Sequence, residues 1–417
     1  MLLKNKQHLL LFILTLSVLL IGVFAINHLP ELQMKASQVL TWVRVALNPA
    51  GQLPTAQVSS AKSVEQSPFW LPDLFTVEPG SPETTVTLAA KQALSALPGS
   101  VTLTPPFFDE TKDYQDWNNC GPATLALGLR YWGWQGDQFT ISQLIRPKRQ
   151  DKNVNIEELA GYVNTSADGL QAEVRTGGDL SRLEDLIAGG YPVIIEEAFK
   201  VEKSAWPGDD LWAGHYLLLT GYDQSTRLFT AQDSYYGPDR LISFADIADN
   251  WQAFNHIYLV VFPIGDLPKV QTLLAQDWPV QDNLKRTAAA AQNQVQLKPG
   301  NAFAWFNLGS SLTDLQDYAS ALQAFDKARA LGLPQRMLRY QFGPLIAAYQ
   351  TGDQKDLAQL ADYALQITPD SEEALLYKGW AYELAGDHLS AIALFHKALE
   401  ANPAYMDAEN ALAIVRP

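Results

Sequence analysis

The residues best suited to chemistry surround the single cysteine of the chain. Cys120 follows Asn118 and Asn119 and precedes Gly121-Pro122. Asparagine is favoured at helix N-caps and proline in the first helical turn, so this pattern predicts a helix that begins near the cysteine. The unpaired amides and the dipole at that end of a helix favour an anion, which makes a nucleophilic thiolate accessible. A lone cysteine is more often a small buried hydrophobe, but this one stands at a polar-to-helix junction.

A thiolate nucleophile needs a base, and the base needs a group that orients it. Two apolar runs, 214–222 and 227–232, are typical of strands, and a turn composition separates them. Folding these runs into a hairpin places His215 directly opposite Asp233, with both side chains on one face and about 5 Å between their Cβ atoms. The carboxylate can then hold one ring nitrogen and leave the other for Cys120, which predicts a nucleophile, base and orienting acid.

Each of these residues also has an ordinary structural interpretation. His215 could be a satisfied core histidine, and Asp233 could cap the turn at 235–238. His256 is a competing base, but it has no acidic partner at hairpin spacing. The spacing of the three residues together favours a catalytic set.

Three motifs in combination resemble a known family: QDWNNCGPA at 115–123, GHYLLLTGYD at 214–223 and QDSYYG at 232–237. They are similar to the papain-fold cysteine peptidases related to bacteriocin-processing (double-glycine) peptidases. The stretches 151–154 and 190–194 are similar to the connecting part of those domains, and the resemblance covers about residues 101–263. It implies an α+β, papain-like cysteine peptidase fold, in which the helix with the nucleophile packs on an antiparallel sheet that carries the histidine and the acid.

The resemblance also implies roles for individual residues. Cys120 matches the family nucleophile, His215 the base and Asp233 the orienting acid, while Gln115 resembles the glutamine of the oxyanion hole. Gln115 departs from the pattern, since it lies five residues before the cysteine where papain-like enzymes usually have six. The transporter domain of the bacteriocin-processing members has no counterpart in the sequence, so we do not expect export of a leader peptide. The loop 206–212 before His215 either overhangs the cleft and helps select substrate or is an ordinary surface loop.

The C-terminal third of the sequence is repetitive. Gly352 and Gly386 are 34 residues apart, as are Pro369 and Pro403, which is the period of tetratricopeptide (TPR) repeats. One copy of the pattern spans 302–334, a second starts near residue 372, and a weaker copy lies between them; residues 282–297 read as a half-repeat that caps the array. The sequence predicts an all-α TPR solenoid of about three repeats, with a generic helical bundle as the alternative. Such arrays bind extended peptides or partner helices on their concave face.

The N-terminus has the features of a targeting segment. Lys4 and Lys6 precede an 18-residue, mostly apolar run, Leu9–Ile26, which just spans a hydrocarbon core of ~30 Å. We expect an uncleaved signal anchor, which makes the protein a single-pass protein of the cell membrane with its bulk extracytoplasmic. The alternative is secretion after cleavage of a signal peptide.

The charge and composition of the chain limit the partners and ligands that we expect. The net charge is −15, from 30 basic and 45 acidic residues, so charge does not recruit nucleic acid. The six histidines lack metal-ligand spacing and no glycine-rich phosphate loop follows a strand, so we expect neither a metal nor a cofactor. The expected partners are a peptide or protein substrate, a protein bound in the TPR groove, and the membrane at the N-terminal helix.

The sequence therefore predicts four segments: an anchor at 1–30, a linker with short helices at 31–100, a papain-like peptidase domain at 101–266 and a TPR domain at 267–417. The predicted function is an exported, membrane-anchored thiol hydrolase that cleaves peptide bonds through an acyl-enzyme. Two alternatives stay open: a catalytically inactive scaffold that works through its repeats, and an acyltransferase with the same thioester intermediate but an amine acceptor.

Overall fold

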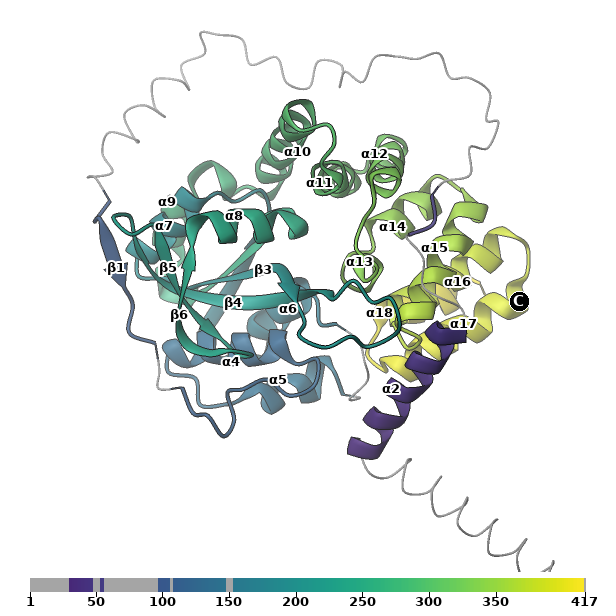
Figure 1. The fold of residues 1–417 in the computed structure, drawn as a ribbon, viewed down its shortest axis with the longest axis horizontal. Coiled ribbons are helices and arrows are strands. Elements are labelled where there is room, and N and C mark those ends of the chain that lie inside the picture. The colour runs from purple at the N-terminus through teal and green to yellow at the C-terminus, as the bar shows by residue number, and fades with distance from the viewer. Residues whose placement is uncertain (1–29, 48–52, 56–96, 106–107, 148–152, 416–417) are drawn as a thin grey trace, which may run out of the picture.

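The computed structural model describes residues 30–47, 53–55, 97–105, 108–147 and 153–415. Within these ranges a sheet covered by helices is followed by an all-helical array, which runs beside it in an arc (Figure 1). The strands are β1 (Ser100–Thr102), β2 (Leu170–Arg175), β3 (Val193–Lys200), β4 (Trp212–Asp223), β5 (Leu228–Asp233), β6 (Gly237–Ser243) and β7 (Tyr258–Pro263). The helices among them are α4 (Cys120–Tyr131), α5 (Gln138–Ile145), α6 (Ile156–Ser166), α7 (Leu180–Ala188), α8 (Phe244–Trp251) and the 3-10 turn η1 (Gln252–Phe254).

All strand pairs are antiparallel, in the order β2-β7-β3-β4-β5-β6, with β1 paired to β4. The central strand β4 is apolar without alternation because both faces of the sheet are covered. Leu218 belongs to the core on the α4 side, whereas Leu217 and Leu219 belong to the core on the opposite side. The helix-on-antiparallel-sheet fold that the sequence predicts is confirmed.

Helix α4 begins at Cys120, as the sequence predicts. Asn119 occupies the N-cap position, but its side chain does not cap the helix. It instead donates to Gln138 Oε1 at 2.7 Å, because the residue is completely buried and an internal acceptor lies within reach.

The register of the β4–β5 hairpin differs from the prediction. Leu218 pairs with Gln232, and an irregularity between Leu219 and Gly221 shifts the ladder toward the turn. Continuing that register puts Asp233 at the level of Leu217, two residues from His215. The expected direct pairing was therefore wrong, because the hairpin closes later in the chain than the prediction assumed: Asp223 already pairs with Leu228 beside the turn. The two residues still share a face of the sheet, since side chains two apart on a strand point the same way.

The C-terminal part is all-helical, as predicted. Its helices are α9 (Leu267–Leu274), α10 (Val280–Leu297), α11 (Ala302–Asp314), α12 (Tyr318–Leu331), α13 (Met337–Tyr340), α14 (Gly343–Gln350), α15 (Gln354–Ile367), α16 (Glu372–Leu384), α17 (His388–Ala401) and α18 (Met406–Ile414), with turns η2 (Ile264–Asp266) and η3 (Ala275–Asp277). The pairs α11–α12, α14–α15 and α16–α17 are the three helix pairs of the repeat, and α10 covers the first. A Cβ at Gly309 would lie 2.6 Å from Phe325, and one at Gly379 would lie 2.4 Å from Phe395. The repeat's glycines therefore let paired helices approach closely.

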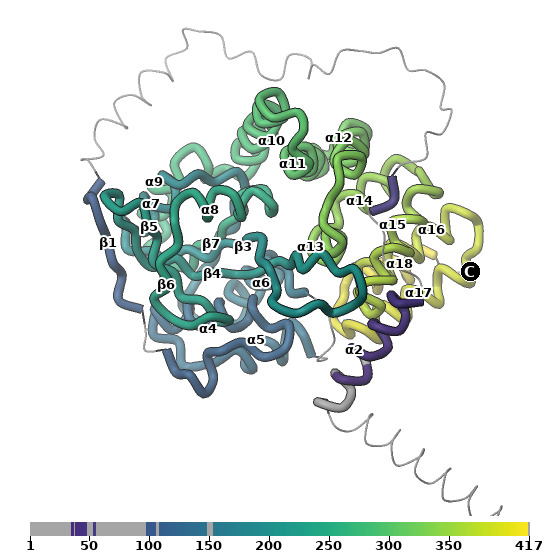
Figure 2. The backbone as a smooth tube through the Cα atoms, viewed as in Figure 1, coloured from purple at the N-terminus to yellow at the C-terminus, as the bar shows by residue number. Residues whose placement is uncertain are grey.

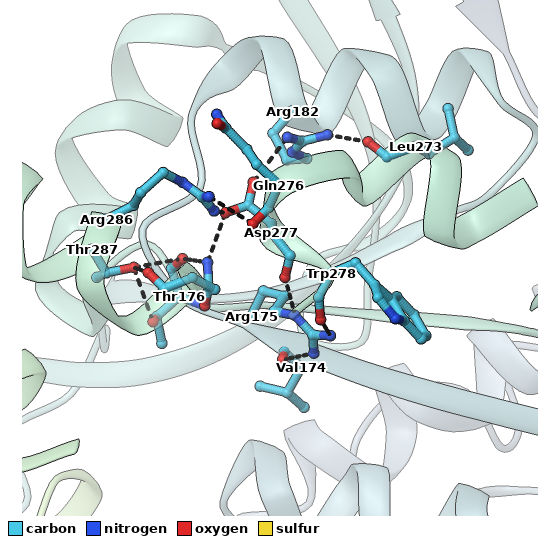
Figure 3. Close-up of polar contacts among 11 residues, drawn as sticks. Val174, Arg175, Thr176, Arg182, Leu273, Gln276, Asp277, Trp278, Arg286 and Thr287 are labelled. Atoms are coloured by element: carbon cyan, nitrogen blue, oxygen red, sulfur yellow. Dashed lines mark hydrogen bonds and ion pairs between the residues drawn. The ribbon is translucent and has the colours of Figure 1, made fainter. Parts of the chain in front are cut away.

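A cluster of arginines joins the sheet to the start of the array. Asp277 in η3 pairs with Arg182 of α7 and Arg286 of α10 (Figure 3). Arg175 at the end of β2 donates to the Asp277 and Trp278 carbonyls, both at 2.6 Å. These bonds fix the first array helices against the sheet.

Helix α2 (Pro30–Leu47) lies in the segment that the sequence predicts to be a linker with short helices. It lies beside the repeat array (Figure 2) and packs on α15. Val45 and Leu53 are buried in the core of the array. Arg329 of α12 donates to the Pro54 carbonyl at 2.9 Å. The predicted anchor run Leu9–Ile26 lies outside the described residues; among the helices that are described, none combines the length and apolarity that crossing a membrane requires.

Candidate active site

Residues from three elements and a loop meet at one cleft. Cys120 is the first residue of α4, His215 lies near the start of β4, Asp233 ends β5, and Gln115 lies in the loop before α4. Cys120, His215 and Gln115 line a cleft of about 560 Å³, and Asp233 lies fully buried next to His215. The structure therefore brings together all four residues that the sequence singles out.

His215 and Asp233 form a buried pair. His215 Nε2 lies 2.9 Å from Asp233 Oδ1, and the side chains are 3% and 0% exposed. Burial alone would raise the pKa of Asp233, but the hydrogen bond and charge of His215, followed by the Tyr235 amide, lower the pKa to about 2. Arg240 donates to Asp233 Oδ2 at 2.5 Å and contributes in the same direction. Asp233 is therefore a carboxylate throughout the neutral range.

The His215–Asp233 pair determines the protonation of the imidazole. Burial disfavours the charged ring of His215, but hydrogen bonds to Asp233 and Cys120 outweigh burial and raise the pKa of His215 to about 10. Because Asp233 takes Nε2, the ring nitrogen left for the thiol is Nδ1. The ring of Phe199 lies against the imidazole, with centroids 4.9 Å apart, and restricts its rotation. The arrangement favours an imidazolium beside the sulfur.

The loop before Cys120 is fixed by polar contacts from α5 and the residue that follows it. Gln138 Oε1 accepts hydrogen bonds from the Asp116 amide at 2.8 Å and the Asn119 side chain at 2.7 Å. Arg146 donates to the carbonyls of Asn118 and Trp117 at 3.1 and 2.9 Å. The backbone around the thiol is thus held in place without any cap on the helix.

Gln115 is tied to the residue after Asp233. Its backbone amide donates to the Ser234 carbonyl at 2.7 Å, and its Oε1 accepts from Ser234 Oγ at 3.1 Å. With the side-chain oxygen held in this way, the amide nitrogen is the end that can donate to a substrate oxygen.

Sequence reasoning missed two charged residues beside the pair. Arg240 reaches Asp233 across the β5–β6 hairpin, and Glu197 is the β3 residue paired with His215. Glu197 is 6% exposed, and burial raises its pKa to about 7, an effect that His215 offsets only in part. The position of Arg240, seven residues after Asp233, could have indicated the first contact, whereas nothing in the sequence pattern of β3 sets Glu197 apart.

His256, the competing base that the sequence offered, lies outside the cleft of Cys120. His256 lines a second cavity with Asp249 and Trp251, between α8 and α10, and not the cleft of Cys120. Burial lowers its pKa to about 4. In this position His256 is not placed to serve Cys120.

The repeat array forms part of the cleft, which the sequence did not indicate. Arg336, Arg339 and Tyr340, in and just before α13, line it together with residues of the sheet and its loops. The loop before β4 that we expected either to overhang the cleft or to be ordinary surface lies at this boundary: Trp206 lines the cleft and is 3% exposed against the array.

Comparison with known proteins agrees with this architecture. Residues 104–259 match the model of the Peptidase_C39 like family. The first domain is a C39-like peptidase domain. Residues 304–328 and 372–405 match the tetratricopeptide repeat, so the C39-like domain is followed by TPR repeats, and the resemblance that the motifs indicated is confirmed.

Among solved structures, xylellain, a cysteine protease from Xylella fastidiosa, is similar at 16% identity and a TM-score of 0.32, over 42% of this chain and 89% of xylellain. MamA is similar at 15% identity and a TM-score of 0.29, over 37% of this chain and 83% of MamA. No curated protein matches the chain. In the part of the chain that the structure describes, there is no cluster of three or more His, Cys, Asp or Glu side chains that could hold a metal ion.

Proposed function

We propose that the protein is a cysteine peptidase that cleaves peptide bonds through an acyl-enzyme. The observation that carries the proposal is the buried His215–Asp233 pair, 2.9 Å apart, in the same site as Cys120 at the start of α4. A C39-like domain supports a peptide as the substrate. In this assignment Cys120 is the nucleophile, His215 the general acid and base, and Asp233 the group that orients the ring.

The reaction follows from these positions. The Cys120 thiolate attacks the carbonyl carbon, and the oxyanion that forms accepts hydrogen bonds from the Cys120 backbone amide and the Gln115 side chain. His215 gives its proton to the nitrogen as the C–N bond breaks, so the amine leaves and a thioester remains. His215 then takes a proton from water, which attacks the thioester and releases the carboxylic acid and the thiol. Asp233 stabilises the imidazolium at each stage.

The chain's location is a separate part of the proposal. The 18-residue apolar run Leu9–Ile26, with Lys4 and Lys6 before it, supports a membrane anchor with the bulk of the chain extracytoplasmic. Helix α2 begins four residues after that run and packs on α15, so the anchor would tether the repeat array first. The TPR repeats support binding of a protein substrate or partner. Fractionation of cells that make the full chain tests the anchor: recovery in the alkaline-washed membrane pellet is expected, and recovery in the supernatant contradicts it.

Cleavage of unstructured polypeptide tests the activity. Full-length protein is incubated with reduced, carboxymethylated casein, and new termini are counted by mass spectrometry. Cleavage by the natural chain and none by Cys120→Ala is expected. Equal product from both proteins would refute the proposal, and products capped by an added amine in preference to water would instead identify an acyltransferase. Lack of cleavage together with slow alkylation of Cys120 would identify a scaffold.

A further inference from the structure

The cleft of the C39-like domain is closed on one side by the repeat array. Tyr340 of α13 lies against the start of β4, where its ring meets Trp212 edge-on with centroids 5.6 Å apart. A Cβ at Gly214 would lie 3.0 Å from the Tyr340 ring and 2.6 Å from Phe254. Glycine at position 214 thus lets an aromatic residue of the array approach the backbone next to His215.

This contact is secured by a buried ion pair between the two domains. Arg336 donates to both carboxylate oxygens of Asp209 at 2.5 and 2.7 Å and to the Trp212 carbonyl at 3.0 Å. Its guanidinium lies 4.1 Å over the Trp206 ring, whose Nε1 donates to Gln335 at 3.0 Å. The segment 201–211, here called the β3–β4 loop, is therefore held by the array just before the strand that carries His215 (Figure 2).

Beside His215 the cleft has an aromatic and aliphatic stretch, which adjoins charged residues of the loop and the array: Glu202, Lys203, Arg336 and Arg339. Tyr340 and the peptidase residues Phe199, Val201 and Tyr235 line the cleft, and all four keep surface open to solvent. Tyr235 is 38% exposed although its ring packs on Phe199 with centroids 5.1 Å apart. Partly exposed apolar side chains gathered in a concave site beside a nucleophile are what a large apolar substrate side chain requires.

We propose that Tyr340 of the repeat array, together with Phe199 of β3 and Val201 of the β3–β4 loop, forms a substrate subsite that binds a large apolar side chain of a peptide next to the bond that Cys120 attacks. The inference rests on the proposed function, because it uses Cys120 as the reacting group. It assigns the array a direct part in substrate selection, since Tyr340 comes from the array.

Chloromethyl ketones test the subsite by covalent capture. With a chloromethyl ketone the Cys120 thiolate forms a C–S bond as the C–Cl bond breaks and chloride leaves; with iodoacetamide the C–I bond breaks and iodide leaves. Rate constants are measured by intact mass on the full chain for Ala-Phe-chloromethyl ketone, Ala-Gly-chloromethyl ketone and iodoacetamide. We expect the Phe reagent to react at least about tenfold faster than the Gly reagent, because apolar pocket contacts discriminate by ~10–200-fold.

Variants of Tyr340 test whether its ring contributes to the subsite. Tyr340→Ala should remove about tenfold of the Phe-reagent rate and leave the iodoacetamide rate unchanged, whereas Tyr340→Phe should keep both. The control is Tyr382→Ala, since Tyr382 is a more exposed tyrosine of α16 that does not line the cleft. Should Tyr340→Ala fail to fold, Tyr340→Leu keeps an apolar side chain and should lose an intermediate fraction of the rate.

The outcomes separate this inference from the proposed function. The subsite is overturned if the Phe reagent has no advantage, or if Tyr340→Ala leaves that advantage unchanged. Where Tyr340→Ala does not fold, an advantage that Tyr340→Leu leaves unchanged overturns the subsite. An iodoacetamide rate in the natural chain no faster than in His215→Ala overturns the proposed catalytic role of His215 instead, whatever the peptidyl reagents do.

Discussion

Removing the charge of Arg336 should loosen the β3–β4 loop. The side chains of Arg336 and Asp209 are 7% and 0% exposed and share two hydrogen bonds. Burial alone would raise the pKa of Asp209, but Arg336 is the main reason that it is lowered. Arg336→Met leaves the carboxylate buried without its cation, and breaking a buried pair in this way costs about 3–5 kcal/mol.

Hydrogen exchange of an amide in the β3–β4 loop measures this loss of stability locally. The Val201 amide donates to the Leu211 carbonyl at 2.9 Å, which closes the base of the loop. If opening the loop breaks the pair, a loss of about 3 kcal/mol speeds exchange of this amide at least about a hundredfold in Arg336→Met. The control is Lys378→Met, which removes a surface pair with Asp362 whose side chains are 27% and 61% exposed. Lys378→Met should change the exchange rate of the Val201 amide by less than about fivefold.

A second substitution checks the cause. Arg336→Met combined with Asp209→Asn removes both charges but keeps a side-chain oxygen for the Ala205 or Leu211 amide, so it should restore part of the protection, because no unpaired charge is then buried. The reasoning is refuted if the exchange rate of the Val201 amide in Arg336→Met stays within about fivefold of the rate in the natural chain. The Arg336–Asp209 pair would then contribute no more than a surface pair.

Three further predictions concern the site itself. Glu197 has a pKa of about 7 against an ordinary 4.5, so its stabilising protonated form is fully present below 4.5 and lost as pH rises through 7. Between pH 4 and pH 8 the free energy of unfolding of the natural protein, measured in urea, should fall by roughly 3 kcal/mol relative to that of Glu197→Gln. The same pH dependence in both proteins would contradict this. Asp233→Asn should lower the pH at which His215 loses its proton from about 10, as followed by 15N NMR; an unchanged midpoint would count against the pair. Gly214→Ala should cut casein cleavage at least ~10-fold because its Cβ meets Phe254, whereas Gly161→Ala, where a Cβ meets nothing within 4 Å, should not.

The sequence predicted the contacts of the candidate catalytic residues better than the backbone geometry behind them. The pairing of His215 with Asp233 could be expected, since strand alternation fixes which side chains share a face. The register could not, because the turn composition at 223–226 does not show which residues close the hairpin, and Asp223 pairs with Leu228. Asn119 likewise takes the N-cap position, but burial beside Gln138 redirects its side chain.

The repeat array was predictable for the same reason as the strands, namely a fixed period. Gly309 and Gly379 recur where Phe325 and Phe395 pack, so a local pattern reports the helix pairing. The contact of Tyr340 with the backbone beside His215 was not predictable. It depends on how two surfaces more than 120 residues apart in the chain dock, and no local periodicity encodes that.

The central claim is that His215, oriented by Asp233, keeps Cys120 reactive, and the pH dependence of Cys120 alkylation tests it most directly. Iodoacetamide rate constants are measured from pH 5 to 9 on full-length natural protein and on His215→Ala. Because His215 stays an imidazolium to about pH 10 and can stabilise the Cys120 thiolate, the natural chain should react at least ~10-fold faster than the variant at pH 6. Coincident profiles that both rise steeply with pH would contradict the account.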